Sequence, residues 1–577
     1  ITDEGREFNV DWRGVWDVRA QQSSSGWSAE FAIPLRTLRY PRGGVQVPWG
    51  FNIYRVIRRN NEEVLWSGWS RANEGFHRVS AAGHLEGLND LPQTGLNLEV
   101  KPYVLVGGTQ EQELAEIDTE PRLDIGLDAK YEVRPGLVLD VTLNTDFAHV
   151  EADDEQVNLT RFDLFFPEKR EFFLENAGIF EFGLRGAFEP PPFLLFFSRR
   201  IGISDDGEIP VLGGVRLSGR VGAQTVGFLD LVTDSAFAEP RSNYAVVRYK
   251  RDVGARNYVG AMLTDRRYAG GSNTAGGLDW SFWPTATLNV QGFVARTATS
   301  GPGGDDSAYR IGVDLQQDRY GFSAQYLMIG PEATADVGFI TRTDTRRTDA
   351  FVRVTPRPGM LGLRKIDLLA FGQLITRVDG LLQDWGVGPA ISPEWDSGES
   401  LTLFYLRGFN RLDEEWELSE SDEVEVSPGD YDLWQLGWFG STSQNRKVVV
   451  GLDGLLQGTF GGHIHTLTGN LRLNPNANIS IQLRYSRSWV DVPDGAFTAD
   501  VGALRLSYAF STRLVANALL QYNDLDNSVS ANIRVNFIHS PGSDLFIVFN
   551  EQRGTDSSLW DFSDRGAVVK VTYLKRL

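Results

Sequence analysis

The sequence contains no cysteine among its 577 residues, which excludes a disulfide framework, a thiolate nucleophile and a cysteine metal site. It also has no run of 18 or more apolar residues, so we expect no transmembrane helix. Basic residues are outnumbered, 56 against 76 acidic ones, and the net charge of −20 argues against nucleic acid as a partner. The chain begins with Ile1 and shows no signal peptide, so we expect a processed or trimmed chain.

Signatures of catalysis are also missing. The sequence has no Gly-x-Ser-x-Gly turn and no HExxH motif. Among its 76 acidic residues, pairs that resemble the two carboxylates of a glycosidase arise by chance, so such a pair carries no weight without its geometry. His463 and His465 share one face of an expected strand, but no third metal ligand lies nearby. We therefore interpret them as residues at the end of a loop and expect the protein not to be an enzyme.

From about Gly95 onward, apolar and polar residues alternate in many consecutive runs. In residues 479–489 and 529–537, one face is apolar and the other carries Gln482, Arg484 and Asn532. Side chains on a strand alternate between two faces, so these runs predict β-strands. The apolar face predicted to meet lipid includes Ile481, Leu483, Ile533 and Val535.

Three features favour a membrane barrel over a soluble sheet. The runs are commonly ten to fourteen residues long, whereas strands of globular sheets average about five or six. The polar face repeatedly carries Arg, Asn, Gln and Asp, as a wet lumen requires, and short and long connections alternate. The pattern predicts an all-β fold in which residues 93–577 form a large antiparallel transmembrane β-barrel of about 24–26 strands.

The alternation of connections also predicts an orientation in the bacterial outer membrane. Short turns mark the periplasmic rim, to which the last strand, residues 566–577, should descend. The long acidic connection 413–430 should then be external, where it either stays hydrated or traps divalent ions that bridge lipopolysaccharide. The expected partners are outer-membrane lipids and lipopolysaccharide, together with glycans or other envelope proteins.

Residues 1–92 carry short, Trp-rich runs broken by Pro and Gly, a pattern typical of an antiparallel sandwich. The segment is short, so we expect a partial β-sandwich. Trp66 and Trp69 could form a platform for a sugar ring. The alternative, which we favour, is that they fill the core of a small domain, where large aromatic side chains are needed for burial.

Residues 144–193 join these two parts and match neither. They combine carboxylates with many rings, which cannot remain in water. Two interpretations stay open: the segment plugs or constricts the barrel lumen, or it supplies one ordinary strand and an external loop. In the first, the rings pack on one another and the charges pair with the wall. The proposed constriction residues are Phe162, Phe165, Phe166, Glu168, Lys169, Arg170, Phe172 and Phe173.

The same segment begins with a dense group of carboxylates. Hard oxygen ligands at this density could hold Ca²⁺, the one cofactor considered, but the spacing is not that of an EF-hand loop. An acidic turn that is solvated or paired with arginine is the favoured alternative. The candidate ligands are Asp146, Glu151, Asp153 and Asp154.

Residues 150–183, VEADDEQVNLTRFDLFFPEKREFFLENAGIFEFG, resemble the signature of a bacterial family of unknown function. In that family, a sandwich like the family-nine carbohydrate-binding modules precedes a large domain thought to be an outer-membrane barrel. Residues 26–34 (GWSAEFAIP) and 49–69 are similar to later strands of such modules. The resemblance implies a barrel serving transport or surface binding, with a periplasmic carbohydrate-binding-like domain. The alternatives are a secreted soluble β-protein that binds or hydrolyses polysaccharide, and a structural or assembly component of the envelope.

Overall fold

The computed structural model describes residues 16–35, 38, 49–68, 81–88, 97–113, 116–147, 150–183, 191–204, 207–254, 256–300, 304–419, 423–555 and 562–577. Strands account for most of this part of the chain. The single α-helix in the described residues, α1 (Glu171–Leu174), is one turn long. No helix among these residues has the length and apolar character needed to cross a membrane.

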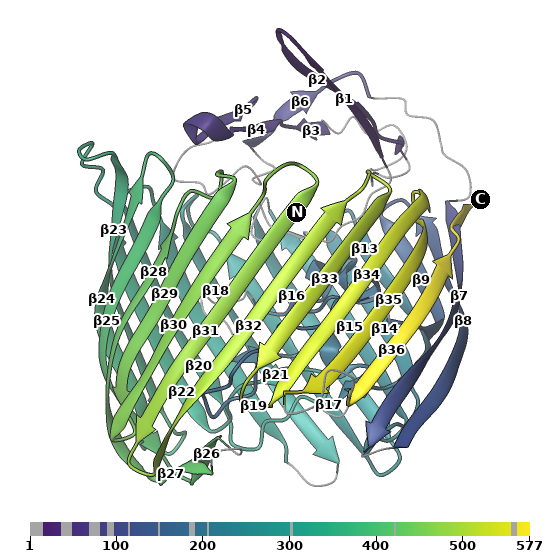
Figure 1. The fold of residues 1–577 in the computed structure, drawn as a ribbon. Helices are drawn as coiled ribbons and strands as arrows, with labels where there is room; N and C mark the ends of the chain where they lie inside the picture. Colours follow the sequence, from purple (N-terminus) through teal and green to yellow (C-terminus); the bar gives the residue numbers. More distant parts are fainter. Residues whose placement is uncertain are drawn as a thin grey trace.

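Within the described residues, 24 antiparallel strands close into a barrel (Figure 1). The last wall strand is broken into β36 (Asp564–Thr572) and β37 (Lys575–Arg576), and both parts pair with β7 to close the ring. The other wall strands are β7 (Leu98–Glu113), β8 (Glu116–Arg134), β9 (Leu137–Thr145), β13 (Val211–Val221), β14 (Gln224–Thr233), β15 (Ser242–Val253), β16 (Asn257–Tyr268), β17 (Gly271–Phe282), β18 (Leu288–Ser300), β19 (Asp306–Gln316), β20 (Tyr320–Ile329), β22 (Thr345–Val354), β23 (Leu363–Thr376), β24 (Leu382–Trp395), β25 (Ser400–Leu412), β28 (Gly429–Ser441), β29 (Val448–Thr459), β30 (Gly462–Leu473), β31 (Ile479–Val492), β32 (Gly495–Ala509), β33 (Leu514–Asn523), β34 (Ser528–Ser540) and β35 (Ser543–Gly554).

This closure confirms the predicted barrel and its range of strand numbers. A single closed ring of strands also argues against the alternative of a secreted soluble β-protein. It also corrects the expectation that residues 144–193 add a crossing: β9 pairs directly with β13, Leu137 opposite Gly219. The wall is therefore continuous without any strand from the intervening segment.

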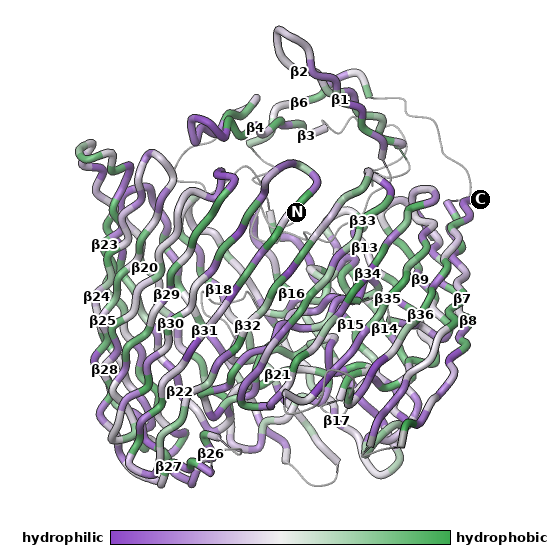
Figure 2. Tube along the Cα trace, in the orientation of Figure 1, coloured by the Kyte–Doolittle hydropathy of each residue, from purple (hydrophilic) through white to green (hydrophobic). Residues whose placement is uncertain are grey.

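The outer face of the barrel is apolar. Exposed Val, Leu, Ile, Phe and Tyr side chains recur at alternate positions on the wall strands, with Leu483 44% exposed and Ile533 40% exposed. Figure 2 shows hydrophobic and hydrophilic residues alternating along these strands. So much outward apolar surface is incompatible with water on every side. A closed barrel with an apolar exterior is the architecture of outer-membrane proteins, and this chain is such a barrel.

The two rims differ in their connections. The rim where the chain ends has short turns, such as the two-residue links 135–136, 222–223 and 541–542. The opposite rim carries longer connections, including 330–344 and 413–428. The two longest of these connections thus lie at one rim, as predicted, although that rim also has two-residue turns such as 269–270 and 460–461. The C-terminus lies at the short-turn rim (Figure 1). The strict alternation that the sequence predicts also fails between β31 and β32, because Val492 pairs with Gly495 across a two-residue turn.

The described N-terminal residues form three two-stranded sheets beside the short-turn rim (Figure 1). Asn61 ties this region to two rim turns: its amide nitrogen donates to the Asp396 carbonyl at 3.1 Å, and its amide oxygen accepts from Asn445 at 2.7 Å. The partial sandwich stays a prediction. The pairs are β1 (Asp17–Ser23) with β2 (Gly26–Ala32), β3 (Trp49–Phe51) with β6 (Gly83–Leu85), and β4 (Tyr54–Ile57) with β5 (Glu62–Leu65).

The expectation that Trp66 fills a core is wrong. Its side chain is 59% exposed and meets the edge of Phe51, with ring centroids 5.7 Å apart. The physical reason is that a two-stranded sheet covers a ring on one face only, and no second layer lies over Trp66 in the described residues. Trp69 lies outside the described residues.

Candidate functional site

The described residues between β9 and β13, numbers 146–210, form what we call the lumen segment. Thr145 pairs with Val211, so the segment leaves and rejoins the wall at one level. Its contacts reach wall strands far apart around the ring: Arg161 pairs with Asp384 of β24, and Glu151 pairs with Arg505 of β32. The segment therefore crosses the interior of the barrel, and the interpretation as an external loop is wrong.

One side of the lumen segment is fixed to the wall by apolar contact. Phe182 and Phe193 both pack on Phe293 of β18, with centroids 5.4 and 5.2 Å apart. Full burial of a side chain of this size stabilises by about 1.5–3 kcal/mol. The buried cluster comprises Phe173, Phe180, Phe182, Phe193, Leu195, Ile201, Val211, Leu229, Leu231, Tyr244, Val246, Met262, Ala275, Phe293, Ala295, Ala308, Leu327, Ile329, Ala333 and Val337.

This cluster corrects the prediction of a uniformly polar lumen face. From β14 to β20 the inner wall carries many buried apolar side chains that the segment covers, together with buried polar ones such as Arg248, Asp279 and Arg310. The sequence carries a signal that was missed. Residues 244–247 read Tyr-Ala-Val-Val, where Val246 is fully buried inside and Val247 is exposed outside. A strand that is apolar on both faces is expected to be shielded from water on both, here by lipid outside and by protein inside.

The five proposed constriction rings divide into two groups. Phe165 stacks on Phe197 at 4.9 Å, and Phe172 meets Phe173 edge-on at 5.2 Å, as the predicted packing of ring on ring requires. Phe162 and Phe166 instead lie under guanidinium groups, those of Arg161 at 5.3 Å and Arg199 at 5.7 Å. Such cation–π contacts stabilise a ring without requiring a fully dry pocket.

The charges at Glu168, Lys169 and Arg170 pair within the segment, not with the wall as predicted. Arg170 is 3% exposed and donates to both oxygens of Glu168 and to the carbonyls of Ile201 and Ser198. Burial raises the pKa of Glu168, but the hydrogen bond and charge of Arg170 outweigh it, so the pKa lies below its ordinary value. The segment folds back on itself, which places these partners closer than any wall residue. The neighbouring Glu171 does meet the wall, 3.6 Å from Lys101.

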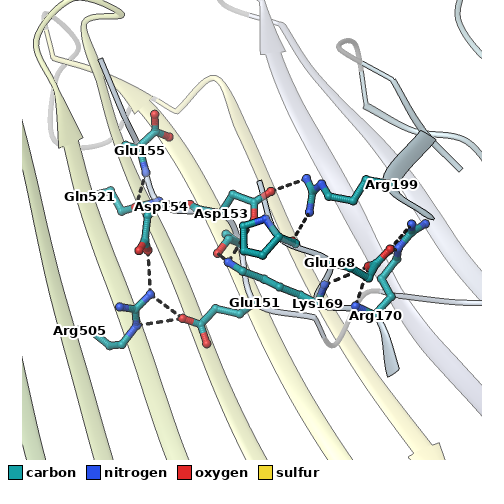
Figure 3. Close-up of polar contacts among 12 residues, drawn as sticks. Glu151, Asp153, Asp154, Glu155, Glu168, Lys169, Arg170, Arg199, Arg505 and Gln521 are labelled. Atoms are coloured by element: carbon teal, nitrogen blue, oxygen red, sulfur yellow. Dashed lines mark hydrogen bonds and ion pairs between the residues drawn. The ribbon is translucent and has the colours of Figure 1, made fainter. Parts of the chain in front are cut away.

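The four candidate calcium ligands are all paired with basic side chains, most of them in Figure 3. These carboxylates are directed to basic side chains on separate parts of the wall and the segment, with only Glu151 and Asp154 sharing a partner, so they do not converge on one ion. The calcium interpretation is thus wrong, and across the described residues no group of three or more His, Asp and Glu could hold a metal. The pairs are Asp146 with Arg122 and Lys570, Glu151 with Arg505 and Arg534, Asp153 with Lys169 and Arg199, and Asp154 with Arg505.

Residues 151–155 are held on β32–β34 by polar contacts (Figure 3). Glu151 bridges Arg505 and Arg534, and Gln521 donates to the Asp153 carbonyl at 3.0 Å while accepting from the Glu155 backbone N–H at 2.9 Å. We call this the ionic anchor. Sequence reasoning missed Arg505, Gln521 and Arg534, although each faces inward in the strand alternation. The lumen segment thus has a dry attachment on β14–β20 and an ionic one on β32–β34.

A cavity of about 500 Å³ lies between residues 154–155 and the wall strands β25 and β28–β32. This volume falls within the range of small-molecule sites, about 300–1,000 Å³. Its lining combines apolar residues with the polar side chains of Asp453, Asn470, Arg472, Gln482 and Arg484. Gln482 stands opposite Arg505, whose side chain meets Glu151 of the lumen segment, so the inward direction predicted for Gln482 and Arg484 is confirmed.

The acidic connection 413–428 folds into a hairpin, β26 (Trp416–Ser419) with β27 (Val424–Val426), at the long-loop rim. Its apolar side packs on the long-loop ends of β30–β32 and on Val157 and Leu159 of the lumen segment. The interpretation as a simply hydrated loop is therefore wrong for its apolar face. On the other face, the charge of Glu415 raises the pKa of Glu425. At the same rim, His463 and His465 lie with ring centroids 5.7 Å apart.

Comparison with known proteins bears on this segment. Residues 94–253 match the model of a domain of unknown function, DUF5916. The match runs from β7 into β15 and contains residues 150–183, so it agrees with the resemblance to a family of unknown function. It does not extend to the N-terminal sheets, and the carbohydrate-binding resemblance is not confirmed.

No curated protein matches the chain. Among solved structures, the siderophore receptor PirA from Pseudomonas aeruginosa is 10% identical, with 84% of this chain and 81% of that chain covered and a TM-score of 0.43. A mutant of the ferric enterobactin receptor PfeA from the same organism is 9% identical, with coverages of 86% and 83% and a TM-score of 0.38. OpdQ, also from P. aeruginosa, is 11% identical, with coverages of 58% and 99% and a TM-score of 0.29.

Proposed function

We propose that the protein is an outer-membrane channel in which the lumen segment narrows a wide barrel to a polar passage. One observation carries the proposal: the segment packs dry on β14–β20, while a polar cavity of about 500 Å³ remains beside β25 and β28–β32. A barrel of 24 strands is too wide for its own side chains to fill. The passage serves small hydrophilic solutes that bind to, or move along, its polar wall.

The ionic anchor sets the width of the passage. Residues 151–155 meet the wall through charge pairs and amide contacts, which salt weakens far more than it weakens the buried aromatic cluster. Release of this anchor widens the lumen while the aromatic side stays in place.

The proposed role is non-catalytic binding and transport. Glu151, Arg170 and Arg199 of the lumen segment each pair with an oppositely charged group of the segment or the wall, so they serve its placement. The outward partners are membrane lipids and lipopolysaccharide, which the apolar band and the long-loop rim would meet.

A second role, binding of glycans by the N-terminal residues, is favoured by the exposed ring of Trp66. An exposed indole face can stack on a sugar ring, as expected of a carbohydrate-binding-like module. The Trp66→Ala variant should then lose retention of the full chain on an immobilised glycan. Unchanged retention in a folded variant would remove this role.

Liposome swelling tests the channel. The full chain is reconstituted, and swelling is followed with neutral sugars of increasing size against protein-free liposomes. We expect rapid swelling with monosaccharides and little with long oligosaccharides, because the segment limits the passage. Absence of swelling with every sugar, for a correctly folded barrel, would overturn the proposal.

A further inference from the structure

The cavity in the lumen contains charges of both signs that do not pair with each other. Arg472, Arg484, Asp453 and Glu155 all line it, and none has an oppositely charged group within 4.0 Å among the described residues. By contrast, Arg505 and Asp154, which line the same cavity, are 2.7 Å apart. Asp453, Arg472 and Glu155 are partly buried, whereas Arg484 is exposed. An unpaired charge that is partly withdrawn from water is costly, so the retention of the three partly buried charges in a cavity favours an external partner.

Neutral neighbours hold three of these four groups in place. Asp453 accepts from the Asn470 amide at 2.9 Å, Arg472 donates to Gln444, and Glu155 accepts from Asn523 at 3.5 Å. Arg484 has no hydrogen bond within the part of the chain that the structure describes. The Nε atom of Arg472 is buried and likewise has no partner there. Donors and acceptors thus remain open toward the cavity.

Strand register fixes the spacing of the opposite charges. Asp453 lies on β29 and Arg484 on β31, on either side of Asn470 of β30, which stands directly opposite Arg484. Neighbouring strands lie about 4.8 Å apart, so the two backbones are roughly 10 Å apart. An extended dipeptide spans roughly 7 Å. Its two termini can therefore reach a carboxylate on one strand and a guanidinium on the other.

We propose that this cavity binds a small zwitterion, a free amino acid or dipeptide, with its carboxylate on Arg484 and Arg472 and its ammonium on Asp453 and Glu155. The inference rests on the proposed channel function and names the solute class of the same passage. Guanidinium groups match the geometry of a carboxylate, and charge-assisted hydrogen bonds are the stronger ones in proteins. A solute with only one charge leaves one pair of cavity groups without a partner.

Equilibrium dialysis of the purified full chain in detergent tests this proposal with three probes of similar size. Glycylglycine carries both charges, N-acetylglycine only the carboxylate, and glycinamide only the ammonium. We expect glycylglycine to bind at least about tenfold more tightly than either of the others. Equal binding of all three, binding of the anion alone, or no binding of glycylglycine would overturn the proposal.

Variants assign the two ends of the solute. Arg484→Gln should reduce glycylglycine binding to the level of glycinamide, and Asp453→Asn should reduce it to the level of N-acetylglycine. Arg484→Lys and Asp453→Glu keep the charges and should restore most of the affinity. Arg267→Gln is the matched control, because Arg267 pairs with Asp265 on β16, outside the residues that line the cavity. Unchanged binding in Arg484→Gln and Asp453→Asn would exclude this site.

The outcome is separable from that of the channel test, because dialysis requires no passage across a membrane. Liposome swelling without glycylglycine binding removes the zwitterion site and leaves the channel. Glycylglycine binding without swelling removes the channel and leaves the site.

Discussion

The ion pair between Arg248 of β15 and Asp279 of β17 gives a sharp test of how the lumen segment is attached. Both side chains are 0% exposed, and two parallel hydrogen bonds of 2.5 and 2.7 Å join them. The Asp279 carboxylate also accepts from the Gly183 backbone N–H at 3.2 Å, and Arg248 lies 5.7 Å from the ring of Phe182. The pair therefore joins the wall to the end of the aromatic run.

Arg248→Met should destabilise the barrel by about 3–5 kcal/mol, because it leaves the Asp279 carboxylate buried without its cation. Removing both charges, in Arg248→Met with Asp279→Leu, should recover much of this loss. The remaining deficit should be about 1–3 kcal/mol, the effect of leaving the Gly183 N–H without an acceptor.

Urea unfolding of the full chain in phospholipid vesicles, followed by tryptophan fluorescence, measures both variants against the unmodified protein. We predict that the double variant is more stable than the single one. A single variant as stable as the unmodified protein would refute this prediction, because the pair would then not be buried in the folded barrel. A double variant less stable than the single one would also refute it, because the pair would then contribute more stability than the burial of its two charges costs.

Three further predictions concern the lipid face, the ionic anchor and pH. Leu483→Arg should cost about 2–4 kcal/mol in refolding titrations because it places a charge in lipid, whereas Gln482→Arg, facing the lumen, should cost little; equal costs would reverse the two faces. Arg505→Gln should expose residues 151–159 to an added protease, more so as salt rises, and full protection at every salt concentration would exclude an ionic anchor. The pKa of Glu168 is lower in the folded protein than in the unfolded chain, where it is about 4.3, so its ionised carboxylate stabilises the fold above that pH. This stability is lost as the pH falls through the folded pKa. Protease protection of the segment should therefore fall on acidification, and Glu168→Gln should be less protected at neutral pH but insensitive to acid.

Most of the wall could be predicted from sequence because lipid outside and water inside impose a two-residue period. Leu483 and Gln482 carry that period plainly, and their sides follow from it. The burial of the lumen segment could be predicted, but the part of the wall that it packs on could not be predicted with the same ease. Its rings had to be buried, but only runs that are apolar on both faces, such as residues 244–247, indicate which part of the wall receives them.

The polar partners of the segment could not be predicted for a related reason. Arg170 meets the Ser198 carbonyl because the chain folds back on itself, a contact across 28 residues. Arg505 lies 354 residues from Glu151, and no local pattern relates them. The zwitterion cavity depends on register between β29, β30 and β31, which the sequence constrains only after the barrel is known.

Single-channel conductance in planar bilayers tests the central claim, that the lumen segment narrows a wide barrel. Residues 163–182 are deleted, and the wall should still close because Thr145 pairs with Val211 and β9 with β13 without any contribution from the segment. We predict a low conductance for the intact chain and a several-fold larger one for a folded deletion variant. Equal conductance of the two folded proteins would contradict the claim.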